Sequence, residues 1–256
     1  MIKAIFFDIN GTLIDIWTVE SDDTVYRVTA NFLDYYGVSV APGELKTLYF
    51  ELNRAQRCRS GEAFPEFDVV RLFETVIDDA AHTSGRAGRR GGKRLAGIAA
   101  LVFRAASRFK LVPYPGVKAV LDALKKTYRM AAVSDGQTVW AGPELRSTGL
   151  AGYFEETVIS GACGFRKPDP RMYELALRKM RLSPREVIFV GNDMYRDIYG
   201  AKSIGMKTVF FRSNQGDQSD RGAAPDYVIE RFEDLPRAVD FLDRAEQDLP
   251  LAEGPG

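Results

Sequence analysis

The sequence predicts an α/β fold in which a parallel sheet is covered by helices and interrupted by an inserted, all-helical segment. Three observations lead to this prediction. Short apolar runs rich in β-forming residues alternate with helical stretches after residue 114. A similar run, residues 4 to 8, stands alone near the start, and residues 20 to 110 between them show helical periodicity only. Because repeated strand–helix units build parallel sheets with helices on both faces, the helical segment is interpreted as an insertion.

The first strand is expected to end at Asp8. The run Ala4-Ile5-Phe6-Phe7 is apolar, and Asn10-Gly11-Thr12 is typical of a turn. In the helical segment that follows, apolar residues recur three or four positions apart. Within it, His82 to Arg94 has four glycines and five Lys or Arg residues. This stretch is therefore expected to be a mobile surface loop.

The alternating region supplies the rest of the sheet. Helices are expected at residues 117–124, 138–148, 171–180 and 196–205, and strands at 130–133, 157–160, 187–190, 208–211 and 227–229. This pattern is typical of a Rossmann-like core with helices on both faces. We assign residues 1–15 and 111–245 to the α/β core, 16–110 to a helical cap domain and 246–256 to a flexible tail.

The composition narrows the classes of function. The 256 residues include 35 Lys and Arg against 35 Asp and Glu, so no overall field attracts a polyanion and nucleic-acid binding is disfavoured. Cys58 and Cys163 have no further ligands at zinc spacing, which favours a reducing, cytoplasmic compartment. The apolar stretch Ile2–Ile14 is broken by Asp8 and Asn10, so neither a signal peptide nor membrane contact is expected. The remaining expectation is a monomer or homodimer that binds a small molecule.

Polar residues follow four of the predicted strands. Asp8 follows the first, Ser134 the second, Lys167 comes shortly after the third, and a cluster from Asn192 to Asp197 follows the fourth. In parallel sheets, ligands bind outside the carboxyl ends of the strands. An acid, a hydroxyl, a lysine and an acidic cluster at one sheet edge are the parts that a phosphoryl-transfer site needs.

Four motifs carry a resemblance to a known family. They are Phe7-Asp8-Ile9-Asn10-Gly11-Thr12-Leu13, Val133-Ser134-Asp135-Gly136, Lys167-Pro168-Asp169-Pro170, and Val190-Gly191-Asn192-Asp193 with Asp197-Ile198 and Gly200-Ala201. With these motifs the chain resembles the hydrolases of the haloacid dehalogenase superfamily, in the phosphatase-like branch with an α-helical cap after the first motif. The resemblance covers residues 1–14 and about 111–212, whereas the cap matches only in length, position and helical character.

The resemblance implies a role for each motif. Asp8 would be the catalytic nucleophile that forms an aspartyl-phosphate. The Ser134 hydroxyl, helped by the backbone amides of Asp135 and Gly136, would bind the phosphoryl oxygens. Lys167 would be both catalytic and phosphate-binding, because it neutralises the charge of Asp8 and of the phosphoryl group.

A magnesium ion is the cofactor that the resemblance implies. Its ligands would be the Asp8 carboxylate, the backbone carbonyl of Asn10, and oxygens from Asn192, Asp193 and Asp197. Mg²⁺ prefers such oxygen ligands and keeps several waters. Which of the last three residues bind the ion directly is left open by the sequence.

Two residues depart from the family pattern. Asn10 stands where phosphatases of the family have a catalytic Asp that protonates the leaving oxygen and then activates water. Because an amide cannot give up a proton near neutral pH, the loss of this acid–base catalysis is expected to cost about 10²- to 10⁴-fold in rate. Asn192 stands where the fourth motif has a metal-binding Asp, and its amide oxygen carries no charge.

The sequence therefore predicts a Mg²⁺-dependent phosphatase of a small phosphorylated metabolite, with weak or leaving-group-selective activity because of Asn10. Two alternatives stay open. A carbon–halogen hydrolase needs no proton for halide to leave, but that branch usually has Tyr in place of Asn10 and lacks the acids Asp193 and Asp197. A catalytically silent protein that binds a phosphorylated metabolite would not need Asp8 or Lys167.

Overall fold

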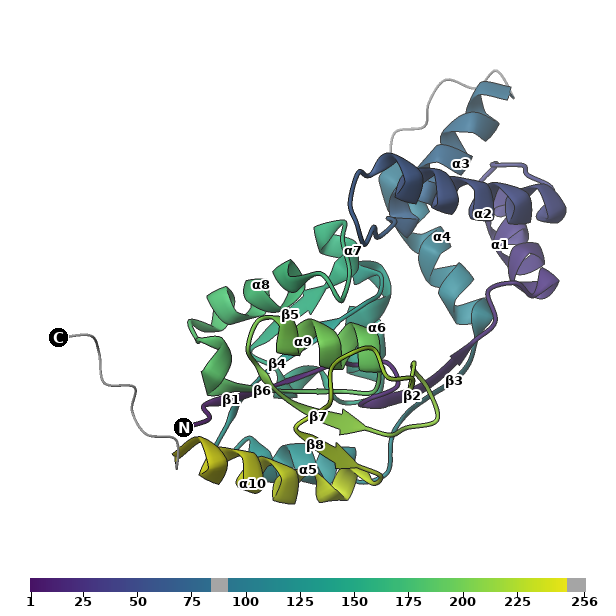
Figure 1. Cartoon of the computed structure of the whole chain (residues 1–256). Coiled ribbons are helices and arrows are strands. Elements are labelled where there is room, and N and C mark those ends of the chain that lie inside the picture. The colour runs from purple at the N-terminus through teal and green to yellow at the C-terminus, as the bar shows by residue number, and fades with distance from the viewer. Residues whose placement is uncertain (84–91, 248–256) are drawn as a thin grey trace.

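Six parallel strands form the central sheet of the protein, seen in the computed structural model of Figure 1. The structure describes residues 1–83 and 92–247. The strands lie in the order β5 (Glu156–Ile159), β4 (Arg129–Ser134), β1 (Ala4–Phe7), β6 (Val187–Gly191), β7 (Lys207–Phe211) and β8 (Tyr227–Ile229). The α/β fold predicted from the sequence is confirmed, and each predicted strand lies within one residue of its expected bounds.

Helices cover both faces of this sheet. They are α5 (Val117–Leu124), α6 (Thr138–Ser147), α7 (Ser160–Cys163), α8 (Pro170–Met180), α9 (Gly200–Ser203) and α10 (Leu235–Gln247). Ile5 and Phe7 of β1 pack on one face with α5 and α10, whereas Ala4 and Phe6 pack on the other with α8 and α9. Figure 1 shows α5 and α10 on the far side of the sheet from α8. Since both faces are covered, β1 is apolar throughout rather than alternating.

In its described residues, the insertion after β1 contains four helices, which we call the cap helices. They are α1 (Asp23–Tyr35), α2 (Pro42–Arg59), α3 (Val69–Thr83) and α4 (Gly92–Ser107). Their buried faces form a separate core that is rich in aromatic rings, with Tyr49 stacked on Phe103 at 4.4 Å between ring centroids. Trp140 of α6 packs into this core, so the cap helices rest directly on the α/β core.

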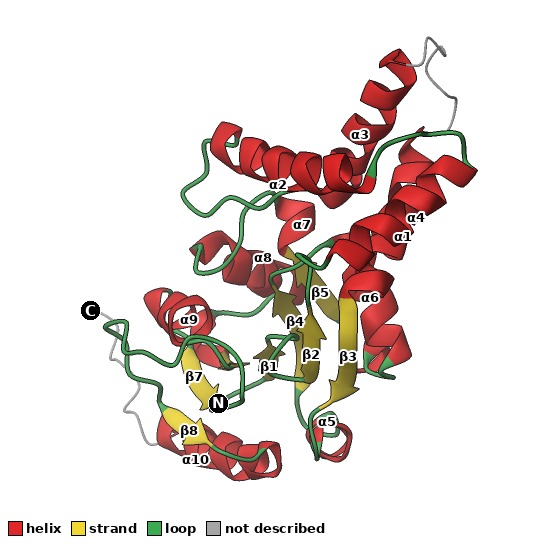
Figure 2. Ribbon diagram, turned by 90° about the vertical axis from the view of Figure 1, so that its right-hand side faces the viewer, coloured by secondary structure: helices red, strands yellow, loops and turns green. Residues whose placement is uncertain are grey.

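A two-stranded antiparallel ribbon joins the cap helices to the core. It consists of β2 (Ile14–Thr18) and β3 (Arg108–Pro113), which lie side by side in Figure 2. The sequence prediction of an all-helical segment over 16–110 is wrong at its two ends, which belong to these strands. The ribbon leaves Trp17 and Phe109 more than half exposed, so it lacks the buried, alternating pattern that reveals a strand in a sequence.

The loop and the tail predicted from the sequence fall largely on residues that the structure does not describe. Most of the loop predicted at His82–Arg94 lies outside the described residues, and α3 and α4 take up its two ends. The predicted tail 246–256 also lies outside them, except that the unpredicted helix α10 runs to Gln247. No helix within residues 1–83 and 92–247 is long and apolar enough to cross a membrane.

Gln137 fastens the cap to the core at a second place. Its Oε1 accepts a hydrogen bond from the Val69 backbone N–H at 2.9 Å, and its Nε2 donates to the Phe67 carbonyl at 2.8 Å. The Gln137 side chain is buried. Close by, the Glu66 carboxylate accepts from the Ser160 hydroxyl at 2.7 Å. The segment that leads into α3 is therefore held against the core by side chains as well as by the ribbon.

Candidate active site

Asp8 lies at the carboxyl end of β1, between the two strands that carry its partners. β1 pairs with β4 on one side and with β6 on the other, and Phe7 lies level with Ala132 and Val190. The residues that follow these strands therefore meet at one edge of the sheet. Ser134, the last residue of β4, donates from Oγ to Asp8 Oδ1 at 3.0 Å.

Lys167 is buried between two carboxylates. Its Nζ donates to Asp8 Oδ1 at 2.7 Å and to Asp197 Oδ1 at 2.6 Å. Burial alone would lower the pKa of Lys167, but the charges of Asp197 and Asp8 outweigh it and raise that pKa. Burial, with repulsion from Asp8, raises the pKa of Asp197 in spite of the lysine. One ammonium thus holds two carboxylates together in a buried site.

Thr12 brings Asp8 and Asn192 to a common point. Its hydroxyl lies 3.1 Å from Asp8 Oδ2 and 2.9 Å from Asn192 Oδ1. Because a hydroxyl has one proton, it satisfies only one of these two oxygens at a time. Gly11 makes the approach possible, since it has φ +88° and a Cβ there would lie 2.4 Å from Asn192. We call Asp8, Ser134, Lys167, Asn192 and Asp197 together the Asp8 site.

The oxygens around Thr12 fit a magnesium ion. Asp8 Oδ2 and Asn192 Oδ1 are hard oxygen donors that share a single proton, so one of them has room for a cation. Asp8 supplies the only full charge of this pair. The described part of the chain contains no group of three His, Cys, Asp or Glu side chains arranged to hold a metal.

Asp193 and the second oxygen of Asp197 have other partners. Asp193 Oδ1 accepts from the backbone N–H groups of Tyr195 and Arg196, and its Oδ2 accepts from the Arg196 guanidinium at 2.7 and 2.9 Å. These hydrogen bonds outweigh burial and lower the pKa of Asp193. Asp197 Oδ2 accepts from the backbone N–H groups of Asn192 and Asp193, both at 3.0 Å. Both oxygens of Asp193 and the Oδ2 atom of Asp197 thus support the loop after β6.

The two residues that follow Ser134 are also engaged. The Gly136 backbone N–H donates to Ser160 Oγ at 2.9 Å. Asp135 Oδ1 accepts from the Lys167 backbone N–H at 3.0 Å, while its Oδ2 is buried without a hydrogen bond and lies 3.8 Å from Arg196 Nη1. Burial raises the pKa of Asp135 in spite of these cations. Of these three consecutive residues, Ser134 is the one whose side chain bonds to Asp8.

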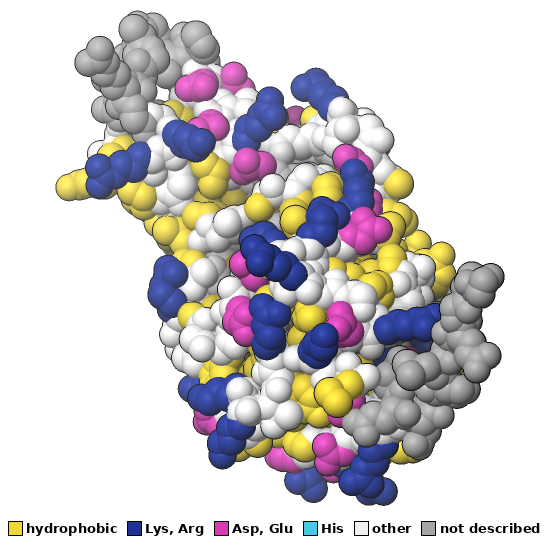
Figure 3. Space-filling model, turned by 90° about the vertical axis from the view of Figure 1, so that its left-hand side faces the viewer, with side chains coloured by type: hydrophobic (Ala, Val, Ile, Leu, Met, Phe, Trp, Pro, Cys, Tyr) yellow, Lys and Arg dark blue, Asp and Glu magenta, His cyan; other side chains and the backbone are white. Residues whose placement is uncertain are grey.

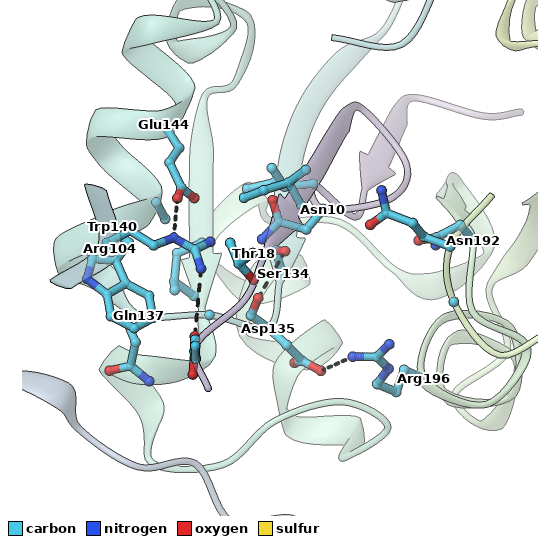
Figure 4. A pocket seen from close by; sticks show the side chains of 18 residues that line it. Asn10, Thr18, Arg104, Ser134, Asp135, Gln137, Trp140, Glu144, Asn192 and Arg196 are labelled. Carbon is cyan, nitrogen blue, oxygen red and sulfur yellow. Dashed lines mark hydrogen bonds and ion pairs between the residues drawn. The ribbon is translucent and has the colours of Figure 1, made fainter. Parts of the chain in front are cut away.

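A cavity of about 390 Å³ opens beside the Asp8 site, as Figure 4 shows. Asn10, Ser134, Asp135, Asn192 and Arg196 line it from the core. The Asn10 Oδ1 atom is buried and has no hydrogen-bond partner. The opposite side, which we call the cap-side wall, consists of Glu20, Arg104, Trp140 and Glu144.

The motifs of the Asp8 site also match a protein family. Residues 2–205 match the haloacid dehalogenase-like hydrolases, a span that includes both the cap helices and the four motifs. The chain belongs to this family. The match confirms that the protein is a hydrolase of the haloacid dehalogenase superfamily. The cap helices follow β1 and β2, as the resemblance implies.

Several relatives within the superfamily are phosphatases by name. The chain is 29% identical to a glyceraldehyde 3-phosphate phosphatase of Pyrococcus abyssi over 83% of this chain and 82% of the relative. It is also 29% identical to the enzyme of the same name from Pyrococcus furiosus, over 95% and 94%. The family match and the similarity to these two phosphatases therefore each extend over most of the chain.

Solved structures with this fold include dehalogenases. The 2-haloacid dehalogenase of Pseudomonas syringae pv. Tomato matches with a TM-score of 0.67 and 23% identity, over 94% of this chain and 99% of that one. The HAD-hydrolase YfnB of Bacillus subtilis, described as bound to magnesium, matches with a TM-score of 0.54 and 16% identity, over 93% and 99%. At these identities the likeness concerns the fold.

The sequence analysis missed the cap-side wall and the role of Thr12. Arg104 comes from α4, Trp140 and Glu144 from α6, and Glu20 from the turn between β2 and α1. No short motif connects these positions. The one available signal is the i, i+4 spacing of Trp140 and Glu144, which places both on one side of α6.

Proposed function

We propose that the protein is a Mg²⁺-dependent phosphatase that hydrolyses a small phosphorylated metabolite through an aspartyl-phosphate at Asp8. The observation that carries this proposal is the convergence of Ser134 and Lys167 on one oxygen of Asp8, beside a cavity of about 390 Å³. A cavity of this size suits a small molecule. The 29% identical relatives with phosphatase names support the same reaction class.

Each residue of the Asp8 site has its own role in phosphoryl transfer. Asp8 Oδ1, which lies beside the cavity-lining Ser134, attacks phosphorus. The P–O bond to the substrate oxygen breaks, and that oxygen leaves as an anion that takes a proton from water. Ser134 and Lys167 then turn their hydrogen bonds from Asp8 to the phosphoryl oxygens and stabilise their charge. Water attacks the aspartyl-phosphate in the second step, which releases phosphate and restores the carboxylate.

Asp8 Oδ2, the Asn10 backbone carbonyl and Asn192 Oδ1 would hold the magnesium ion. Thr12 already gathers the two side-chain oxygens of this set. The ion would neutralise part of the charge on the phosphoryl group. Asp193 and Asp197 act behind these ligands, because their oxygens order the backbone at Asn192 and beyond.

Asn10 makes the reaction selective for the leaving group. Its side chain lines the cavity but cannot supply a proton to the departing oxygen. Aryl and acyl phosphates, which leave readily as anions, are hydrolysed much faster than alkyl phosphates. For the same reason the aspartyl-phosphate is hydrolysed slowly and accumulates in a burst.

The face of the protein in Figure 3 supports a small substrate rather than a polyanion. Lys and Arg side chains lie among Asp and Glu side chains over this face, in line with the balanced charge of the chain. A nucleic acid would need a continuous basic surface. This face therefore favours a small substrate over a nucleic acid, in line with the cavity of about 390 Å³.

Carbon–halogen hydrolysis is the second candidate, because Asn10 places no acid next to the leaving group. One assay separates the two. The protein is mixed with phenyl phosphate or with 2-chloropropionate, and phosphate and halide are measured with Mg²⁺ and with excess chelator. Phosphate release that stops on chelation supports the phosphatase, whereas halide release that persists in chelator overturns it. Binding of phosphate without any turnover supports a silent binding protein instead.

A further inference from the structure

Arg104 brings a positive charge from the cap helices into the wall of the cavity. Its guanidinium stacks over the Trp140 ring, with the Cζ atom 4.7 Å from the ring centroid. The side chain is 13% exposed, so it is held in the wall rather than free in solvent. Figure 4 shows Arg104 and Arg196 on opposite sides of Asn10 and Ser134. Arg104 therefore lies at the end of the cavity opposite Asn192 and Arg196.

Two carboxylates fix this guanidinium. Arg104 Nε donates to Glu144 Oε1 at 2.6 Å, and Nη1 lies 3.9 Å from Glu20 Oε1. Glu20 is itself held by the Tyr49 hydroxyl, which donates to its Oε2 at 3.1 Å. Because three partners position Arg104, it needs little ordering when a ligand arrives.

The Nη groups of Arg104 keep unused hydrogen-bonding capacity. A guanidinium has five N–H donors. Of the Arg104 nitrogens, only Nε makes a hydrogen bond to the described residues 1–83 and 92–247. The contact of Arg104 Nη1 with Glu20, at 3.9 Å, is an ion pair beyond hydrogen-bond distance. The remaining donors belong to a residue that lines the cavity, beside Thr18 (Figure 4). They are available to an oxygen of the substrate.

The charge balance of the cap-side wall decides which oxygen this is. Glu20 and Glu144 carry two negative charges against the one positive charge of Arg104, so the wall is negative overall. A second phosphate or a carboxylate placed there would gain the attraction of Arg104 but suffer repulsion from both glutamates. A hydroxyl or carbonyl oxygen would gain the hydrogen bond without that repulsion.

We propose that Arg104 is a specificity-determining residue that binds a neutral hydroxyl or carbonyl oxygen at the end of the substrate remote from the phosphate. Glu20 and Glu144 hold it there and exclude substrates with a second anionic group. The proposal rests on the proposed function and narrows its substrate class to monophosphates of short polyols or hydroxycarbonyl compounds. The apolar side chains of Ile9, Ile16 and Ile159 in the same cavity suit the carbon chain between the two ends.

Two three-carbon phosphates that differ at the remote end test the proposal. Glycerol 3-phosphate ends in a hydroxyl and 3-phosphoglycerate ends in a carboxylate, and both have alkyl leaving groups, so the effect of Asn10 cancels in their ratio. We expect kcat/KM with Mg²⁺ to be at least about tenfold higher for glycerol 3-phosphate. Glu20→Gln removes one negative charge and should reduce this ratio about tenfold. Arg104→Met should raise KM for glycerol 3-phosphate about tenfold relative to that for phenyl phosphate, which has no remote oxygen.

The matched control is Glu155→Gln, which removes a glutamate that pairs with Arg129 outside the cavity. It should leave all substrate ratios unchanged. Equal kcat/KM values for the two three-carbon phosphates in the parent protein, or the same ratio in Glu20→Gln as in the parent, overturn the proposal.

A binding measurement separates this proposal from the phosphatase reaction itself. The chain has two tryptophans, Trp17 and Trp140, and Trp17 is 63% exposed on the ribbon. In Trp17→Phe, fluorescence therefore reports on Trp140, under the Arg104 guanidinium. Stronger binding of glycerol 3-phosphate than of 3-phosphoglycerate supports the proposal even if no phosphate is released, a result that would count against the phosphatase alone. Equal binding, or no response to either probe, overturns it.

Discussion

The two ends of the cavity are built in different ways. The Asp8 site is made by residues that follow neighbouring strands, and the pairing of β1 with β4 and β6 determines their positions. The cap-side wall is made by side chains of α4, α6 and one turn, which meet because helices pack together. Main-chain hydrogen bonds thus position the proposed chemistry, whereas side-chain packing positions the proposed specificity. Changes at the first end should affect the rate on every substrate, and changes at the second should affect the choice among substrates.

Asp8→Asn tests the first half of this comparison and should have the largest effect. The amide keeps the shape of the side chain but cannot act as the nucleophile, so phosphate release should fall by about 10⁴-fold or more on all substrates. Phosphate release from phenyl phosphate measures the loss. Asp122→Asn, which alters an exposed ion pair with Lys125 on α5, is the control and should keep full activity. A residual rate within tenfold of the parent would remove Asp8 from the mechanism.

Asn10→Asp should have the next largest effect and sharpens the comparison inside the core end. A carboxyl group at this position can protonate the leaving oxygen and activate water, so turnover of glycerol 3-phosphate should rise about 10²-fold. The first step with phenyl phosphate should change much less, because phenolate leaves without help. Burst kinetics with both substrates on both proteins separate the steps. Equal sensitivity to the leaving group before and after the substitution would show that Asn10 is not the limiting residue.

Gln137→Ala tests the contact between the cap and the core, which holds the two ends of the cavity together. The change leaves the Phe67 carbonyl and the Val69 N–H without their buried partner, so the free energy of unfolding should fall by about 2 kcal/mol. Gln56 is a matched control because it makes the same pair of bonds to the backbone of Asp68, but within the cap and near solvent. Gln56→Ala should cost less than about 1 kcal/mol. Equal losses in urea unfolding would mean that Gln137 does not link cap and core.

Asn192→Asp should have the smallest of these effects. It adds a full charge to the oxygens around Thr12, so the Mg²⁺ concentration for half-maximal phosphate release should fall about tenfold. The shift of the melting temperature on Mg²⁺ addition gives a second readout. Asn53→Asp on α2 is the control and should leave the Mg²⁺ requirement unchanged. A requirement that stays the same in Asn192→Asp would exclude Asn192 as a ligand.

The sheet and the residues at its strand ends could be predicted because short sequence patterns report them. A buried strand is a short apolar run, and Asp8, Ser134 and Asn192 each stand directly at the end of one. The long-range step, that these ends meet, follows from parallel pairing alone. Lys167 was also identified from sequence, although it belongs to a loop beyond β5, because its motif is distinctive.

The ribbon and the cap-side wall could not be predicted for a common reason. β2 and β3 are short and half exposed, so their residues do not show the alternation of a buried strand. Arg104 and Glu20 are polar residues whose meeting depends on how α4 packs, and no local pattern encodes that. The hydrogen-bond partners of Asp193 could not be predicted either. An acid next to Asn192 suggests a metal ligand, but only the fold shows that it binds Arg196 and the backbone of the next turn.

The ribbon also determines how the cap can change over evolution. Ile14 pairs with Pro113, and the Tyr114 N–H donates to the Leu13 carbonyl at 3.0 Å, so the chain re-enters the core one hydrogen bond from where it left. The insert begins and ends at this ribbon, whereas β1 pairs with β4 and β6, which both lie outside the insert. A different insert would replace Glu20 and Arg104 in the cap-side wall, while Trp140 and Glu144 of α6 would stay in place. Substrate range can thus diverge by replacement of one insert while the nucleophile stays where the sheet holds it.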